Sequence, residues 1–173
     1  MTIVRPATLT DLDFIVEGNR CLAAETEDLH LDRAVLTAGV RAVLTDAAPG
    51  RYWIAERDGQ PVGQLLITFE WSDWRNRMVW WIQSVYVLPN ARQHGVFRTL
   101  YAHTQQAARA AGAAGLRLYV DTTNTRAQAV YTALGMNGGH YRVFEAMFGD
   151  APVAADDAPT SAEGASATPQ TAR

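Results

Sequence analysis

The feature that most constrains this fold is a change of hydrophobic period along the first half of the chain. Residues 12–24 and 32–44 place apolar side chains three and four positions apart, as helices that bury one face do. Residues 51–88 instead read as strands, and Asp58-Gly59 within them is a strong two-residue hairpin signal. Two helices followed by consecutive strands predict one sheet with helices packed on it.

Local signals along the rest of the chain complete the predicted element order, β-α-α-β-β-β-α-β-α-β. Pro89 ends the third strand of the central run, and Gly112 and Gly135 follow predicted helices. The order predicts an α/β fold with a mixed, mostly antiparallel central sheet flanked by about four helices. The predicted strands are residues 2–7, 51–56, 62–69, 78–88, 116–120 and 141–148, and the predicted helices are residues 12–24, 32–44, 95–111 and 127–134.

The composition predicts one globular domain with a disordered tail. Residues 1–149 contain the periodic segments, and a 48% hydrophobic share of 173 residues suffices for one buried core. Residues 150–173 lack aromatic residues, are rich in Ala and Pro, and carry four acidic residues against one arginine. Such a segment buries too little apolar surface to offset the entropy of ordering. We therefore expect the net charge of −3 to reside in an unstructured acidic tail.

Charge and motif content disfavour several classes of function. The charges of residues 1–149 balance, so no basic face for nucleic acid is expected. No apolar run approaches the ~20 residues of a membrane span, and the first residues lack a signal-peptide core, so we expect a cytoplasmic protein without membrane contact. Cys21 is the single cysteine and the histidines lack metal-ligand spacing, so neither a disulfide nor a metal site is predicted.

One strand–turn–helix connection carries the clearest chemical signal. A buried strand ends at Leu88-Pro89, and Arg92-x-x-Gly95 then opens a helix. The first N–H groups of a helix lack internal partners and lie at the positive end of its dipole, and a glycine lets an anion approach closely. The turn therefore indicates an anion site, although it is neither a P-loop nor a dinucleotide fingerprint. The residues of this candidate site are Val85, Tyr86, Val87, Arg92, Gln93, His94, Gly95, Val96, Phe97 and Arg98.

A strand, Asn124, Tyr131 and then Leu134-Gly135 follow this connection. The whole arrangement, over roughly residues 2–148, resembles the GNAT superfamily of acyl-CoA-dependent N-acetyltransferases. Arg92 and Gly95 match two fixed positions of the family's Gln/Arg-x-x-Gly-x-Gly/Ala signature. Phe97 stands at the third position, where a small residue is usual, and its ring would weaken cofactor binding if it faced the phosphates.

The resemblance implies an N-acetyltransferase with acetyl-CoA as cosubstrate and without a metal. By this resemblance, the turn's backbone amides hold the CoA pyrophosphate, the strand at 85–87 pairs with the pantetheine arm, and Asn124 lies beside that arm. The acceptor would be a primary amine of a small molecule, which attacks the thioester directly. A homodimer is compatible with the family.

The resemblance also assigns to Tyr131 the role of general acid toward the departing CoA sulfur. A free thiol titrates near ~8.5 and a tyrosine near ~10, so complete proton transfer to the thiolate is uphill by about 2 kcal/mol. We therefore expect Tyr131 to act mainly as a hydrogen-bond donor that stabilises developing negative charge. The alternative is a core tyrosine, because position 131 lies on the apolar face of its predicted helix.

The sequence leaves the base for the amine open. An alkylamine of pKa ~10.4 is protonated at pH 7, so an enzyme usually supplies a base, directly or through water. Many family members carry a glutamate at the position of Gln83, whose amide can orient a water but cannot accept the proton. The candidate carboxylates are Glu70, which ends a strand, and Glu25 and Glu27 in a predicted acidic loop. Solvated surface charge is the alternative for each of them.

Strand alternation places Trp81, Gln83 and Val85 on one face, where Trp81 is a candidate aromatic wall for the acceptor, with core packing as the alternative. Two other functions stay open from the sequence. One is a non-catalytic acyl-CoA sensor, which Gln83 and Phe97 favour, and the other is an enzyme that acetylates protein.

Overall fold

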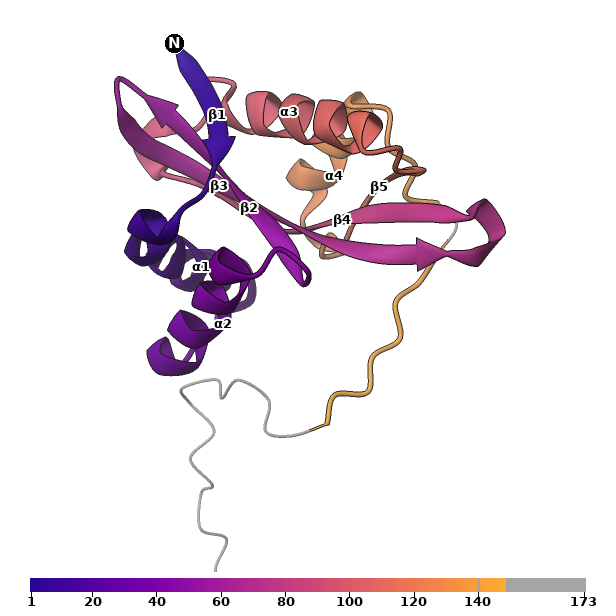
Figure 1. Cartoon of the computed structure of the whole chain (residues 1–173), viewed down its shortest axis with the longest axis horizontal. Helices are drawn as coiled ribbons and strands as arrows, with labels where there is room; N and C mark the ends of the chain where they lie inside the picture. Colours follow the sequence, from indigo (N-terminus) through magenta and orange to yellow (C-terminus); the bar gives the residue numbers. More distant parts are fainter. Residues whose placement is uncertain (140, 149–173) are drawn as a thin grey trace, which may run out of the picture.

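A five-stranded sheet forms the centre of the molecule, and helices cover both of its faces (Figure 1). The computed structural model describes residues 1–139 and 141–148. The strand order is β1-β2-β3-β4-β5; the first three pairs are antiparallel and β4–β5 is parallel. The strands are β1 (Thr2–Pro6), β2 (Gly50–Arg57), β3 (Gln60–Ser72), β4 (Arg77–Val87) and β5 (Gly115–Leu118). The α-helices are α1 (Leu12–Glu27), α2 (Arg33–Thr45), α3 (Val96–Ala110) and α4 (Thr125–Ala133).

The predicted mixed sheet with flanking helices is confirmed. Asp58 and Gly59 both have positive φ angles, 52° and 74°, and connect β2 to β3 as the hairpin signal indicated. The side chain of Asp32 accepts a hydrogen bond from the Val35 amide at 2.8 Å and caps α2 where the sequence places the helix start.

Two hydrophobic clusters lie on opposite faces of the sheet. On one face, α3 packs its buried residues, among them Val96 and Leu100, against Leu65 and Trp80 of the sheet. On the other face, α1 and α2 cover β2, and Ile15 packs there in the second cluster. The helix pair and the long helix are therefore separated by the sheet, as Figure 1 shows.

A buried polar contact fixes α1 on its face of the sheet. The Gln64 side chain of β3 is fully buried, and its Nε2 donates to the Ile15 carbonyl oxygen at 3.1 Å and to Asn19 Oδ1 at 2.8 Å. Gly18 lies against this amide so closely that a Cβ there would come within 2.7 Å of Gln64 Oε1. The absence of a side chain at Gly18 lets α1 approach β3 closely at this point.

A β-bulge at Gln83 changes the side-chain alternation of β4. Leu66 of β3 pairs with Ser84 and Ile67 pairs with Ile82, so Gln83 has no partner on β3. The predicted shared face of Trp81, Gln83 and Val85 is therefore wrong. Ile82 belongs to the α3-side core, and beyond the extra residue Val85 packs on that same side.

The bulge also marks the place where β4 and β5 part. Their parallel pairing covers Val79–Ile82 of β4 and ends at the pair Ile82–Leu118. Beyond it, β4 continues to Val87 while β5 has ended. We call the stretch of β4 that has no β5 partner, residues 83–87, the fork. Its edge toward β5 carries backbone groups that no strand among the described residues satisfies.

The predicted sixth strand at residues 141–148 is wrong. These residues form no strand and leave the body of the molecule (Figure 1). The described sheet consists of β1 to β5 and does not include this segment. The predicted tail, residues 150–173, lies outside the described residues.

The predicted acidic loop is also wrong at its start. Helix α1 continues through Glu27, and its C-cap residue Asp28 has a φ of +54°.

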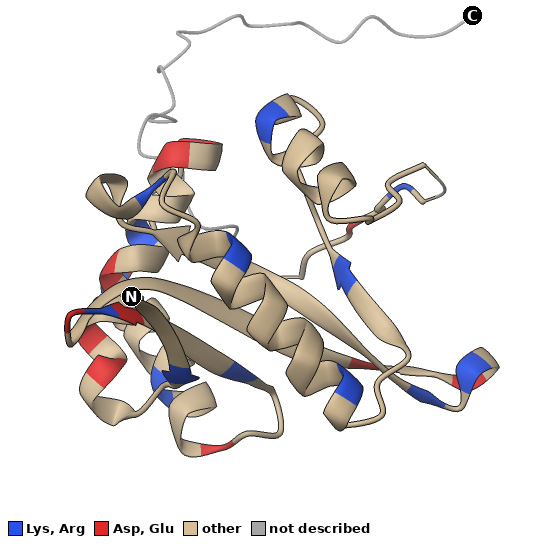
Figure 2. Ribbon diagram, turned by 90° about the horizontal axis from the view of Figure 1, so that it is seen from above, with Lys and Arg blue, Asp and Glu red and all other residues tan. Residues whose placement is uncertain are grey.

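None of the helices in the described part of the chain is long and apolar enough to cross a membrane. Over the described residues, arginines are spread across helices, the β3–β4 hairpin and β5 rather than gathered on one face (Figure 2).

Candidate active site

The connection from β4 to α3 folds into a glycine turn, residues 92–95. Gln93 and Gly95 both have left-handed backbone, with φ of +64° and +78°, and α3 begins directly afterwards at Val96. The first amides of a helix lie at its positive end without intrahelical partners. Val96, Phe97 and Arg98 supply these amides, and α3 is 15 residues long. The turn thus presents a set of N–H donors that can bind an anion.

The space in front of Gly95 is open. An added Cβ at this position would meet no atom within 4 Å, and the residue is exposed. His94, also exposed, folds back so that its Nδ1 lies 2.6 Å from the Arg92 carbonyl oxygen. The described side chains therefore leave this surface accessible.

The Arg92 side chain turns away from the helix start and holds other elements. Its Nε donates to the Val87 carbonyl oxygen at 2.9 Å, and its Nη2 donates to both carboxylate oxygens of Glu25 at 2.7 and 3.0 Å. Its guanidinium also lies over the Tyr86 ring, 5.4 Å from the centroid. Arg92 therefore joins the end of β4 and the last turn of α1 to the glycine turn.

Tyr86 completes this contact from the sheet. Its hydroxyl donates to Glu25 Oε1 at 3.1 Å. Burial, with Cys21 and the Glu25 carboxylate close by, raises the pKa of Tyr86. Glu25, predicted as a substrate-binding acid, is thus placed on α1 and paired with an arginine and a phenol. Glu27, two positions further along the same helix, is exposed to solvent.

The ring of Phe97 points into the space between α3 and α4. It contacts Tyr101 with centroids 6.1 Å apart and meets Tyr131 edge-on at 5.9 Å. It is part of the apolar packing on the α3 side of the sheet. The residue that departs from the family signature therefore does not crowd the turn, and it positions Tyr131 instead.

Tyr131 lies on α4 and is half-buried. Burial raises the pKa of Tyr131, so its hydroxyl stays protonated at neutral pH. Asn124 caps the same helix, because its Oδ1 accepts from the Ala127 amide at 3.0 Å. Asn124 therefore fixes the start of the helix that carries Tyr131.

Glu70 of β3 lies in a cluster that we call the Trp81 cluster: Glu70, Trp81, Arg117 and Tyr119. Glu70 Oε2 accepts from Trp81 Nε1, and Oε1 accepts from Arg117 Nη1 at 2.6 Å. The rings of Trp81 and Tyr119 lie 4.5 Å apart, and Arg117 lies over Trp81 at 5.8 Å. Glu70, the predicted base, is therefore paired with the Arg117 cation. Trp81, the predicted aromatic wall, has a second ring beside it, that of Tyr119.

Sequence reasoning missed Arg117, Tyr119 and the contacts of Tyr86. Arg117 is the cross-strand neighbour of Trp81 on β5. Neither strand alternation nor motif spacing reveals that pairing, because parallel neighbours are distant in sequence. Gln83 is exposed at the bulge. Among the described residues, no hydrogen bond joins it to a candidate carboxylate.

The fold and the glycine turn together define a class of protein. In this class, the two parallel strands of a mixed sheet separate beside the first turn of a helix, and that turn faces open space. The model of the GNAT acetyltransferase family matches residues 18–136, so this chain belongs to that family.

Solved structures agree with this assignment. A possible acetyltransferase from Clostridium difficile 630 is 38% identical with a TM-score of 0.81, and the match covers 87% of this chain and 99% of that one. Aminoglycoside N-acetyltransferase AAC(6')-Iy in complex with CoA is 22% identical, with a TM-score of 0.69 and coverage of 85% and 95%.

A ribosomal-protein-alanine N-acetyltransferase from Brucella melitensis biovar Abortus 2308 is 14% identical, with a TM-score of 0.68 and coverage of 86% and 100%. The two more distant likenesses show the shared fold. A comparison with curated proteins found no match.

Proposed function

We propose that this protein transfers the acetyl group of acetyl-CoA to a primary amine of a small molecule, which attacks the thioester directly. The observation that carries the proposal is the glycine turn: left-handed backbone at Gly95, open space in front of it, and α3 starting at the next residue. Membership of an acetyltransferase family supports the same reaction.

The coenzyme would be held by backbone groups on two adjoining elements. Amides of residues 93–98 would bind the pyrophosphate, where the helix dipole favours negative charge. The fork continues this surface, because Val85, Tyr86 and Val87 present a strand edge without a partner in the described sheet. An extended pantetheine arm is suited to such an edge, since its amide groups can replace the missing strand.

Acetyl-CoA supplies an acyl group that is activated as a thioester. The amine nitrogen forms a bond to the carbonyl carbon, the carbon–sulfur bond breaks, and the electron pair of that bond stays on sulfur. Tyr131 would donate a hydrogen bond to this developing thiolate. Because burial raises the pKa of Tyr131, complete proton transfer becomes less favourable and hydrogen-bond donation becomes its main contribution.

The acceptor would lie on the side of the sheet that carries the Trp81 cluster. Trp81 and Tyr119 provide aromatic surface, which attracts an ammonium group through its π-face. Glu70 and Glu25 are each paired with an arginine, so we propose that they set the local field and that the amine proton leaves to water beside Gln83.

A free-thiol assay over polyamines, amino acids, aminoglycosides and peptides tests the proposal. We expect acetyl-CoA-dependent release of CoA thiol with at least one small amine and a matching acetylated product by mass spectrometry. Tight CoA binding without turnover on any acceptor would instead establish the sensor function. Turnover on peptides alone would establish a protein acetyltransferase.

A further inference from the structure

One residue of the glycine turn has an uncommon backbone conformation. Among the described residues, a positive φ occurs outside glycine at Asp28, Asp58, Asn76 and Gln93. Aspartate and asparagine enter the left-handed region more readily than most residues, because their short polar side chains can bond locally. Gln93, with a φ of +64°, is the exception. Such strain persists only where surrounding contacts hold it, and it occurs most often at functional sites.

Gln93 is held between two anchored positions. On one side, the guanidinium of Arg92 donates to the Val87 carbonyl oxygen at 2.9 Å and to Glu25 Oε2 at 2.7 Å. On the other side, Val96 begins α3 and is buried in the core between that helix and the sheet. The contacts of Arg92 therefore help to fix the backbone of the turn.

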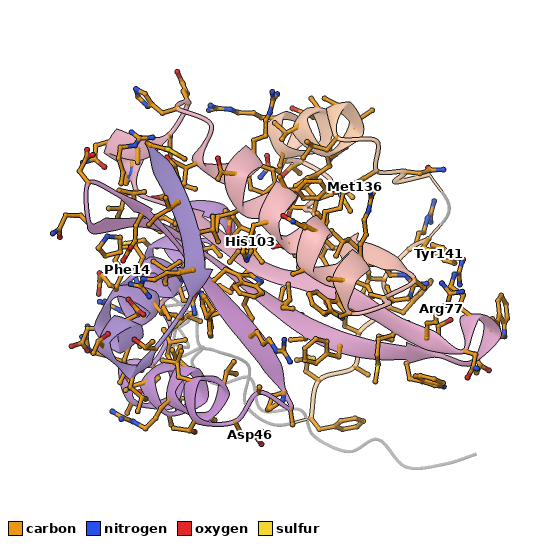
Figure 3. All side chains as sticks on the ribbon, turned by 45° about the horizontal axis from the view of Figure 1, so that its top comes forward. Phe14, Asp46, Arg77, His103, Met136 and Tyr141 are labelled. Carbon is orange, nitrogen blue, oxygen red and sulfur yellow. The ribbon has the colours of Figure 1, made fainter. Side chains whose placement is uncertain are left out.

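The Glu25 contact joins two layers that the sheet otherwise separates. α1, which carries Phe14, and α3, which carries His103, pack on opposite faces of the sheet (Figure 3). Glu25 lies in the last turn of α1, 67 positions before Arg92 in the sequence. The Tyr86 hydroxyl donates to Glu25 Oε1 at 3.1 Å, so the sheet holds this carboxylate as well. At the end of the sheet, α1 thus reaches the turn from which α3 begins.

We propose that Glu25 is a positioning residue for the coenzyme: through Arg92 it holds the left-handed backbone of Gln93, and with it the direction of the turn's amides. This inference rests on the proposed coenzyme site at the glycine turn. Donors that are already in place do not have to be ordered when the ligand binds, so the ligand binds more tightly. Glu25 would act without touching the coenzyme itself.

Charge alone predicts the opposite effect on coenzyme binding. A carboxylate in the vicinity of a diphosphate repels it, so removing that carboxylate and freeing Arg92 from its ion pair would tighten CoA binding. If Glu25 holds the turn, its removal instead weakens CoA binding, because Gln93 can leave the left-handed region. A residue that only binds the acceptor would change the KM of the amine and leave the affinity for CoA unchanged.

Calorimetric titration of the full-length protein with CoA separates these cases. Glu25→Gln should raise the CoA dissociation constant about fivefold, the factor that the loss of one partly exposed ion pair can supply. Glu17→Gln is the matched control on the same helix, because Glu17 accepts from Arg20 at 2.9 Å and from Arg33 at 3.4 Å and is also accessible to solvent. The control should keep the wild-type affinity, and both variants should unfold near the wild-type temperature.

Gln93→Gly tests the route from Glu25 to the amides of the turn. Glycine adopts a positive φ without steric cost, so the turn no longer needs the anchor. In the Gln93→Gly background, Glu25→Gln should therefore change the CoA dissociation constant less than about twofold.

The titrations also separate this inference from the proposed function. Wild-type protein that does not bind CoA would overturn both. If the wild type binds CoA, unchanged or tighter binding by Glu25→Gln would overturn the inference alone, and so would an equal loss in Glu17→Gln. A fivefold loss that persists in the Gln93→Gly background would overturn it too, because Glu25 would then act on CoA by another route.

Discussion

The proposed coenzyme side and the proposed acceptor side of this molecule offer a ligand different chemical groups. At the glycine turn and the fork, the groups available to a ligand are backbone amides and carbonyls, and the nearby side chains Arg92 and Phe97 are turned away. On the acceptor side, the groups available are side chains, and the carboxylates Glu25 and Glu70 are each paired with an arginine.

The difference explains why the coenzyme side follows from the sequence more directly than the acceptor side. A backbone site needs a helix start, a left-handed residue and a strand edge, and the first two of these are specified by local sequence. A side-chain site needs a group that is free at the right place, and pairing between distant elements decides whether it is free.

The largest effect is expected from Gly95→Val. The substitution forces a β-branched residue into a φ of +78° and fills the open space before the α3 amides. Losing about two charge-assisted hydrogen bonds corresponds to an affinity loss for CoA of about 10³-fold, measured by titration calorimetry. Gly112→Val is the matched control, because Gly112 has a φ of +72° and equally open surroundings at the other end of α3. It should lose comparable stability and keep CoA affinity; unchanged binding by Gly95→Val would contradict the site.

A smaller effect is expected from Tyr131→Phe. Removing one hydrogen-bond donor to the developing thiolate should slow turnover about a hundredfold, with CoA affinity within about twofold of wild type. Burial raises the pKa of Tyr131, so the hydroxyl is protonated below that pKa, and any loss of turnover from its ionisation should occur only above pH 10. Tyr101→Phe, in the same aromatic group, should leave turnover unchanged. Unaltered turnover in Tyr131→Phe would refute its role.

The smallest effect is expected from Glu70→Gln. The Glu70–Arg117 pair is partly exposed, at 40% and 34%, so its loss should cost at most about 1 kcal/mol and raise the amine KM about fivefold. Because we assign the proton to water, the turnover rate and its acidic pH limb should be nearly unchanged. Glu27→Gln, at an exposed carboxylate, is the control. Turnover slowed about a hundredfold or more, with loss of the acidic limb, would make Glu70 the base.

Sequence alone predicted the helices, the hairpin at Asp58-Gly59 and the sheet, because periodicity and turn residues act locally. It could not predict the bulge, since an unpaired residue in β4 is defined only by the register of β3. The sequence also could not show that α1 continues through Glu25. Glu25 is an acidic residue in an acidic run, yet its partner Arg92 lies 67 positions away.

The candidate site divides in the same way. The turn and the helix start followed from Arg92-x-x-Gly95, and the direction of the Phe97 ring depended on Tyr101 and Tyr131 of the packed structure. The segment at residues 141–148 has the composition of a strand, but composition does not say which edge a strand will meet. That information is held by another element of the fold.

The bulge in β4 lies where the strand leaves its parallel neighbour. Gln83 has no cross-strand partner on β3, and the ladder resumes one residue later with Ser84 opposite Leu66 and Val85 opposite Leu65. A chain one residue shorter at this point would keep both pairs and form a regular ladder, with Val85 still on the face of Leu65. The extra residue bends and twists β4 directly after its last pair with β5, Ile82–Leu118. The opening between the two parallel strands thus begins at an insertion in the backbone.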